Sequence, residues 1–151
     1  MTGRGAPAVR DLRSEDLDDA HALDRACFEP GIAYSRAELR MLMGRSGAIG
    51  LAIEENGRLL AFAIAERRGR VGHLVTIDIA ASARRRGLGR RLYAEAARRL
   101  AGGGATEIRL EVDVRNAGAI RFYESLGFEK TRVLKSYYGR GLDGYEMAVD
   151  L

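Results

Sequence analysis

The stretch Arg84-Arg85-Arg86-Gly87-Leu88-Gly89-Arg90-Arg91-Leu92 joins an apolar segment to an amphipathic one. The preceding residues 73–80 (HLVTIDIA) are rich in β-branched side chains and predict a buried strand. From Leu88 to Leu100 an apolar residue recurs every four positions, with arginines on the other faces, which predicts an amphipathic helix. Glycines let a backbone approach a ligand closely, and a helix start offers unpaired N–H groups and a positive dipole end. The stretch therefore favours a phosphate-binding turn over a plain connection with a solvated basic face.

Composition predicts one globular domain over residues 1–151, because 46% of the chain is hydrophobic. No run of about 18 apolar residues exists, so no membrane span is expected, and the N-terminal MTGRGAPAVR lacks the apolar stretch of a secretory signal. A single cysteine, Cys27, allows no internal disulfide and agrees with a cytoplasmic location. The two histidines, His21 and His73, belong to no cluster with metal-ligand spacing, so no metal is expected.

Charge is distributed unevenly along the chain, whose net charge is +4. Residues 14–24 contain five acidic side chains, whereas residues 84–99 contain seven arginines. Such a basic stripe is a possible nucleic-acid surface. However, arginine is common throughout this chain, and the stripe, in which Tyr93 is the one aromatic residue, lacks the aromatic interleaving that single-strand binding favours. The phosphates of a small ligand explain the stripe more economically.

The remaining patterns predict an alternation of strands and helices on both sides of the glycine turn. In order, the expected elements are a strand at 8–13, a helix capped by Ser14 and ending at Cys27, a helix from the Ser35–Glu38 capping box to about Gly44, strands at 48–55 and 58–67 joined by Asn56-Gly57, a strand at 71–80, the helix from Leu88, a break at 102–104, a strand at 106–114, a helix at 117–126, and strands at 128–138 and 144–149. This order predicts an α/β fold with helices on both faces of one mixed sheet.

Two stretches together resemble the GNAT superfamily of acyl-CoA N-acyltransferases. One is the R-x-x-G-x-G turn at 84–89, and the other runs from Leu110-Glu111-Val112 through Asn116 to Phe122-Tyr123-Glu124-Ser125-Leu126-Gly127-Phe128. Within the superfamily the sequence is most similar to bacterial ribosomal-protein-alanine and related protein N-terminal acetyltransferases. The resemblance implies a GNAT-like, mostly antiparallel sheet of six to seven strands, with acetyl-CoA as the cosubstrate.

The resemblance also implies which residues bind the cosubstrate. It assigns the pyrophosphate to the turn residues Arg84, Arg85, Arg86, Gly87, Leu88, Gly89 and Arg90. It places the pantetheine arm along the strand edge at Ile77, Asp78 and Ile79, and gives Asn116 a hydrogen bond to the same arm. From the residues alone, a plain buried strand explains Ile77, Asp78 and Ile79 equally well, and the alternative for Asn116 is the cap of the following helix.

Three residues are candidates for the chemistry of amine acetylation. The resemblance assigns the general base to Glu111 and the general acid, which protonates the leaving thiolate, to Tyr123, twelve residues later. His73 is the second candidate for the base, because an unperturbed histidine titrates nearer neutrality. The structural alternatives are a solvent-facing strand residue at Glu111, a hydrogen-bonded strand-end histidine at His73 and a core tyrosine at Tyr123.

The function implied is acetyl transfer from acetyl-CoA to a protein N-terminal α-amine, by direct attack within a ternary complex. An α-amine has a pKa of about 8, against about 10.4 for lysine, and is the easier acceptor near neutral pH. Four aromatic residues are candidates for gripping the acceptor peptide, namely Phe28, Tyr34, Tyr137 and Tyr138. Ordinary packing explains Phe28 and Tyr34 equally well. Acetylation of a small amine and a non-catalytic acyl-CoA-binding role stay open, and nucleic acid is expected only through a ribosomal substrate.

Overall fold

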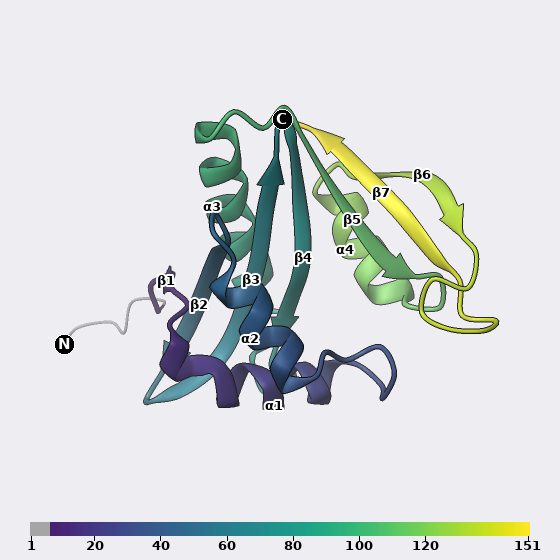
Figure 1. Cartoon of the computed structure of the whole chain (residues 1–151). Coiled ribbons are helices and arrows are strands. Elements are labelled where there is room, and N and C mark those ends of the chain that lie inside the picture. The colour runs from purple at the N-terminus through teal and green to yellow at the C-terminus, as the bar shows by residue number, and fades with distance from the viewer. Residues whose placement is uncertain (1–6) are drawn as a thin grey trace.

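The computed structural model describes residues 7–151, in which strands and helices alternate along the chain. The elements are β1 (Arg10–Asp11), α1 (Leu17–Cys27), α2 (Arg36–Gly44), β2 (Ile49–Glu55), β3 (Arg58–Arg68), β4 (Val71–Ile79), α3 (Leu88–Gly102), β5 (Glu107–Asp113), α4 (Ala117–Ser125), β6 (Glu129–Leu134) and β7 (Gly144–Asp150), with short 3₁₀ turns at Ser14–Asp16 and Ala81–Ala83. The strands form one sheet in the order β1-β2-β3-β4-β5-β7-β6 (Figure 1). The α/β fold predicted from the element order is therefore confirmed.

Helices cover both faces of the sheet, α1 and α2 on one and α3 and α4 on the other (Figure 1). From Leu88 to Leu100, every fourth residue of α3 is at most 2% exposed, so the predicted apolar face is the buried one. The core on the opposite face is built around Leu39, Phe62 and Ile64, all at most 1% exposed. Within residues 7–151 no helix combines the length and the apolar character needed to cross a membrane.

The sheet is antiparallel except where β4 meets β5. These two strands run parallel and pair only from Val71 opposite Glu107 to His73 opposite Arg109. Beyond His73 they diverge, because β4 stays paired with β3 while β5 follows β7, and Figure 1 shows the resulting V between them. The edge of β4 that faces β5 thus carries backbone groups with no strand partner, which leaves them available to a ligand.

Local signals predicted most element boundaries correctly. Ser35 and Glu38 form the expected capping box at the start of α2, with bonds of 3.0 Å and 2.9 Å. Asn56 and Gly57 form the hairpin turn, both with positive φ.

Other expectations at the boundaries are wrong. The strand expected at 8–13 is only Arg10–Asp11, and Ser14 caps no helix: its hydroxyl bonds Glu15, while the Asp16 carboxylate accepts the Arg13 N–H. The strand expected at 128–138 ends at Leu134.

Two further expectations concern the glycine break and the N-terminus. The glycine break expected at 102–104 starts only at Gly103, because α3 includes Gly102. Residues 1–6, on which the expected lack of a secretory signal partly rests, lie outside the described residues.

Candidate functional site

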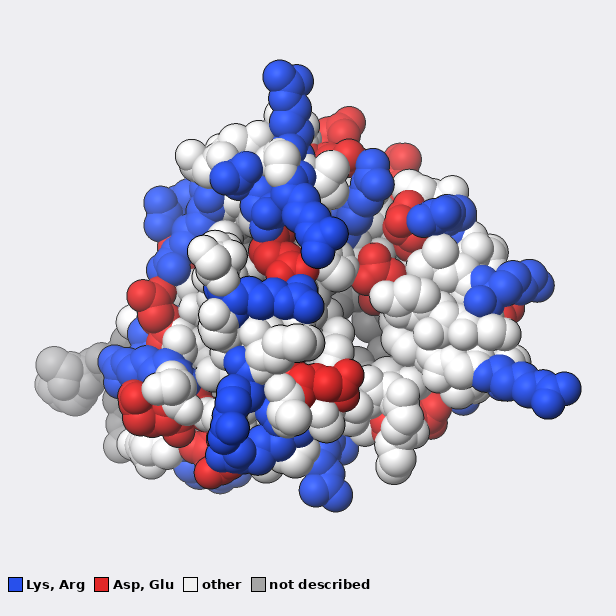
Figure 2. Space-filling model, viewed as in Figure 1, with Lys and Arg blue, Asp and Glu red and all other residues white. Residues whose placement is uncertain are grey.

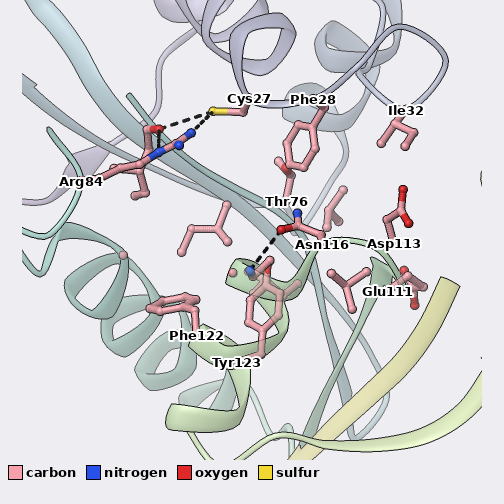
Figure 3. Close-up of a pocket in the computed structure, with 18 of the residues that line it drawn as sticks. Cys27, Phe28, Ile32, Thr76, Arg84, Glu111, Asp113, Asn116, Phe122 and Tyr123 are labelled. Carbon is pink, nitrogen blue, oxygen red and sulfur yellow. Dashed lines mark hydrogen bonds between the residues drawn. The ribbon is translucent and has the colours of Figure 1, made fainter. Parts of the chain in front are cut away.

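A cavity of about 1020 Å³ fills the V between β4 and β5. Its walls come from β4, β5, the turn before α3, the start of α4 and the connection between α1 and α2, here called the α1–α2 loop (residues 28–35). Figure 3 shows Phe28 and Ile32 entering from this loop, Thr76 from β4, Glu111 from β5 and Tyr123 from α4. The divergence of two strands therefore brings together most of the residues singled out from the sequence.

The turn before α3 has the backbone geometry of an anion cradle. Arg85 and Gly87 both have positive φ, of 65° and 76°, and α3 starts at Leu88, where no side chain of residues 7–151 caps the first N–H groups. Six residues of this turn line the cavity, namely Arg84, Arg85, Gly87, Leu88, Gly89 and Arg90. An uncapped helix start beside arginines fits a phosphate group. Gly89 has a packing role as well, since a Cβ there would lie 3.0 Å from the Phe122 ring.

The arginine stripe is largely occupied by contacts within the protein. Arg86, outside the cavity lining, pairs with Glu55 at 3.2 Å, and Arg98 and Arg99 both bond Glu95. Basic side chains lie beside acidic ones over the face shown in Figure 2. Because three of the seven guanidiniums already have anionic partners, the stripe is not an open basic field of the kind that nucleic acid favours.

The strand residues assigned to the pantetheine arm differ in their placement. Ile77 and Ile79 line the cavity, whereas the Asp78 side chain is fully buried outside it. Asn116 lines the cavity, and its side-chain oxygen accepts the Ala119 N–H at 3.1 Å, so this residue also caps α4. The helix-cap interpretation of Asn116 is therefore correct, and its position at the cavity leaves a ligand contact open to the same residue.

The two candidate bases are in direct contact. The His73 Nε2 atom lies 2.7 Å from Glu111 Oε1, because the parallel pairing of β4 with β5 ends at His73. The other ring nitrogen, Nδ1, lies 3.9 Å from Glu66 Oε1, and the Tyr137 hydroxyl donates to Glu111 Oε1 at 3.4 Å. The hydrogen bond to Glu111 raises the pKa of His73 above its usual value, against the effect of burial. Glu111 lines the cavity and His73 stands directly behind it.

Tyr123 has the environment of a tyrosine that keeps its proton. It lies on α4, is 9% exposed, and packs its ring against Phe122 and Phe128. Burial raises its pKa, and a negative charge on the nearby Asp78 would add to this effect. Since Tyr123 also lines the cavity, its position suits a proton donor at neutral pH.

The aromatic candidates for the acceptor side gather at one end of the cavity. Phe28, Tyr34 and Tyr138 line it, and burial raises the pKa of Tyr34 to about 12. Tyr137 lies outside the lining and is 50% exposed, but its ring contacts Tyr138 at 4.8 Å between centroids.

An ion-pair network at this end was not anticipated from the sequence. Arg115 bonds both Glu29 of the α1–α2 loop and Asp113 at the end of β5, and it holds the pKa of Asp113 below its usual value. All three residues line the cavity, as do Ile32 and Thr76, which were also not anticipated. The 86 residues that separate Glu29 from Arg115 leave no sequence signal for their contact. The network therefore connects the α1–α2 loop with the end of β5 at the cavity.

Comparison with known proteins gives consistent matches. A family model described as "Acetyltransferase (GNAT) family" matches residues 11–128. The N-alpha-acetyltransferase of Saccharolobus solfataricus is 42% identical over 80 residues, which cover 52% of this chain and 48% of that protein, so the match spans about half the length of this relative.

Two further matches concern one bacterial protein. The [ribosomal protein bS18]-alanine N-acetyltransferase of Escherichia coli K12 is 35% identical over 101 residues, covering 67% of this chain and 68% of that one. The crystal structure of the ribosomal-protein-S18-alanine N-acetyltransferase from Escherichia coli superposes with a TM-score of 0.83 at 27% identity, over 95% of this chain and 92% of that chain.

Proposed function

The chain belongs to the GNAT acetyltransferase family, and from this premise we propose that it transfers the acetyl group of acetyl-CoA to the N-terminal α-amine of a protein. The observation that carries the proposal is the cavity between β4 and β5, which places an anion cradle, a free strand edge, Glu111 and Tyr123 around one space. The likeness to the Escherichia coli enzyme supports a ribosomal protein as the acceptor. A cytoplasmic location is part of the same proposal, in agreement with the single unpaired Cys27.

The residues present fit acetyl-CoA. The positive φ values of Arg85 and Gly87 turn the backbone before α3 into a cradle, and the uncapped N–H groups of α3 face the same cavity. We assign the pyrophosphate to this turn and the pantetheine arm to the free edge of β4 at Ile77 and Ile79. When bound, the cosubstrate supplies an acetyl thioester to the part of the cavity between Glu111 and Tyr123.

Glu111 and His73 act as one proton-accepting unit in this proposal. An α-amine has to lose a proton before or during its attack, and a carboxylate at the cavity wall accepts that proton directly or through one water. The 2.7 Å hydrogen bond to His73 orients the Glu111 carboxylate and offers the proton a second position on the imidazole. Glu66, 3.9 Å from the far side of the ring, stabilises the imidazolium that would form.

Tyr123 is the proton donor on the other side of the reaction. Its raised pKa keeps the hydroxyl protonated until a thiolate develops nearby. Proton transfer from Tyr123 would let the sulfur leave as a neutral thiol. The proton taken from the amine by the Glu111–His73 pair is released to solvent, and the Tyr123 phenolate regains a proton from solvent before the next turnover. In this proposal Glu111 and Tyr123 divide the two proton transfers between a strand and a helix that both line the cavity (Figure 3).

Kinetics with matched acceptors test the proposed acceptor class. A peptide with a free N-terminus, the same peptide with a blocked N-terminus and a set of free polyamines and amino acids would be compared by kcat/KM. We expect the free peptide to be turned over and the blocked one to be inert. Turnover of the small amines together with inert peptides would instead establish a small-molecule acetyltransferase.

Gly87→Val is expected to weaken CoA binding by about tenfold or more while the protein stays folded. Space is open around Gly87, but its φ of 76° is strained for any residue with a Cβ and especially for a β-branched one. The left-handed conformation costs roughly 1–2 kcal/mol, so the turn would leave the cradle geometry. Calorimetric titration with CoA measures the effect.

Gly44→Val is the matched control, because Gly44 also has open space and its φ is not positive. Equal CoA affinity in the two variants would exclude the turn as the phosphate site.

His73→Gln is expected to shift the acid limb of the pH–rate profile to lower pH. In the native enzyme the raised pKa of His73 means that an imidazolium pairs with Glu111 as the pH falls, and the paired carboxylate is a weaker base. The same pair stabilises the fold at pH below the ordinary histidine pKa of about 6.5, a contribution lost as the pH rises through the raised pKa.

Profiles of kcat for the native enzyme, His73→Gln and the control His21→Gln would be measured with one peptide, so that the titration of its amine is common to all three. Superimposable native and His73→Gln profiles would remove His73 from the mechanism.

A further inference from the structure

Two fully buried carboxyl groups lie between α1 and β4, outside the machinery described so far. Asp24 on α1 and Asp78 on β4 are both 0% exposed. Asp24 Oδ2 accepts the Tyr34 N–H at 2.7 Å, and Asp78 Oδ1 accepts the Thr76 hydroxyl at 2.6 Å. The second oxygen of each group, Asp24 Oδ1 and Asp78 Oδ2, is also buried and has no hydrogen-bond donor among the other described residues. Two ionised carboxylates in this environment would be prohibitively unfavourable.

The local register of the sheet places Asp78 against α1. Between Ile64 and Ala65 the pairing of β3 with β4 shifts by one residue, and Asp78 then stands opposite Phe62. Phe62 and Ile64 belong to the apolar core that α1 and α2 cover. Asp78 is therefore surrounded by hydrocarbon on the helix side of the sheet, and the carboxyl group of Asp24 is its polar neighbour there.

A shared proton resolves this arrangement. Burial and the neighbouring Asp24 carboxyl group both raise the pKa of Asp78 well above its usual value. A neutral Asp78 donates its proton to Asp24, and the two oxygens that lack other partners are then both satisfied. The other titratable groups that face the pair are Cys27 on α1, with Arg84 beside its sulfur, Tyr34 in the α1–α2 loop and Tyr123 on α4.

We propose that Asp24 and Asp78 share one proton, carried by Asp78, and that the pair holds the α1–α2 loop in position against β4. Asp24 anchors the loop through the backbone N–H of Tyr34, whose ring lines the cavity together with Phe28. Asp78 anchors the pair to the strand between Ile77 and Ile79, which line the same cavity. The pair thereby sets the acceptor wall relative to the cosubstrate-binding strand, and both are positioning residues. The positioning role rests on the proposed acetyl transfer, whereas the proposal of a shared proton is independent of it.

The protonation state of Asp78 also acts on the proposed general acid. A negative charge on Asp78 raises the pKa of Tyr123, which makes the tyrosine a weaker proton donor. A neutral Asp78 therefore keeps the loop in place and does not raise the pKa of Tyr123 further. Loss of the proton at alkaline pH would remove both effects together.

Infrared spectroscopy of the folded protein tests the shared proton without any acceptor. The native protein near neutral pH is expected to show the C=O stretch of a protonated carboxylic acid. Asp78→Asn, in which an amide N–H replaces the shared proton at the same shape, should lose that band, and the surface control Asp19→Asn should keep it. A native protein without the band, or an unchanged band in Asp78→Asn, would overturn the shared proton.

Stability against pH gives a second measurement on the same variants. A carboxyl group whose pKa is raised by folding opposes the folded state increasingly as the pH rises above its unfolded value of about 3.9. The denaturation midpoint of the native protein should therefore fall relative to that of Asp78→Asn as the pH rises from that value through the raised pKa. A constant difference across this range would contradict a proton carried by Asp78.

The positioning role is tested on Asp24. Asp24→Ala removes the acceptor of the Tyr34 N–H and is expected to raise the peptide KM about tenfold, with little change in acetyl-CoA affinity measured by calorimetry. Asp24→Asn keeps an oxygen for Tyr34 and donates an N–H to Asp78, so it should restore most of the loss. An unchanged KM in a folded Asp24→Ala would overturn the positioning role. If no peptide is turned over, the proposed function is wrong, but the infrared experiment still tests the shared proton. The KM of Asp24→Ala would then be measured with whichever amine the enzyme acetylates.

Discussion

Glu111→Gln is expected to lower kcat by about 10²–10⁴-fold, the range that a general base typically contributes. Glutamine keeps the size of the side chain and can still bond His73, but its amide accepts no proton at neutral pH. The substitution lies on the acceptor side of the cavity, across from the turn that we assign to the pyrophosphate, so acetyl-CoA affinity should be nearly unchanged. Steady-state kinetics with a peptide, together with calorimetry for the cosubstrate, measure the two quantities.

Glu107→Gln is the matched control, because Glu107 lies on the same strand and pairs with Arg109 away from the cavity. This variant should retain the native rate. If Glu111→Gln keeps a near-native kcat at saturating substrate while His73→Ala is inactive, the base is His73 and not Glu111. Inactivity of both would support the joint proton-accepting unit that their 2.7 Å contact suggests.

Tyr123→Phe is expected to slow turnover by about 10²-fold or more, because thiolate departure loses its proton donor. Only one hydroxyl is removed, and the ring keeps its contacts with Phe122 and Phe128, so the fold should be preserved. Rapid-quench measurement of a single turnover isolates the chemical step from product release. Circular dichroism verifies that α4 is intact.

Tyr93→Phe controls for the loss of a tyrosine hydroxyl from the same core. Tyr93 lies on α3, and its ring also meets Phe128 edge-on, at 5.6 Å between centroids. Because Tyr93 lies outside the cavity lining, Tyr93→Phe should turn over at the native rate. Equal rates in the two variants would assign Tyr123 a purely structural role.

The parts of the fold that the sequence predicts are those set by local interactions. The period-four apolar face of α3, the capping box at Ser35 and the Asn56-Gly57 turn each depend on residues a few positions apart, and each is present as expected. The cap expected at Ser14 fails because Asp16, two residues later, bonds the Arg13 N–H and pairs with Arg10 on β1. A contact to another strand therefore overrides a local preference.

The site was predictable only to the level of its individual residues. Glu111, Tyr123 and the glycine turn stand in recognisable motifs, but nothing in their spacing indicates that His73 bonds Glu111 from 38 residues away. That contact depends on where β4 and β5 stop pairing, which is a property of the whole sheet. The buried pair of Asp24 and Asp78 could not be predicted either. Asp24 by itself looks like a surface residue of an amphipathic helix, and nothing in the sequence indicates that it is buried on the same side of the sheet as Asp78.

The most direct test of the proposed function is the position of the transferred acetyl group on a peptide that offers both kinds of amine. The enzyme would be incubated with isotopically labelled acetyl-CoA and a peptide that carries a free N-terminal alanine and an internal lysine, and tandem mass spectrometry would locate the label. Our account predicts label on the α-amine, none on the lysine, and none on either in the Glu111→Gln variant over the same time. Label on the lysine alone, or on neither amine while a free polyamine or amino acid is acetylated, would contradict it.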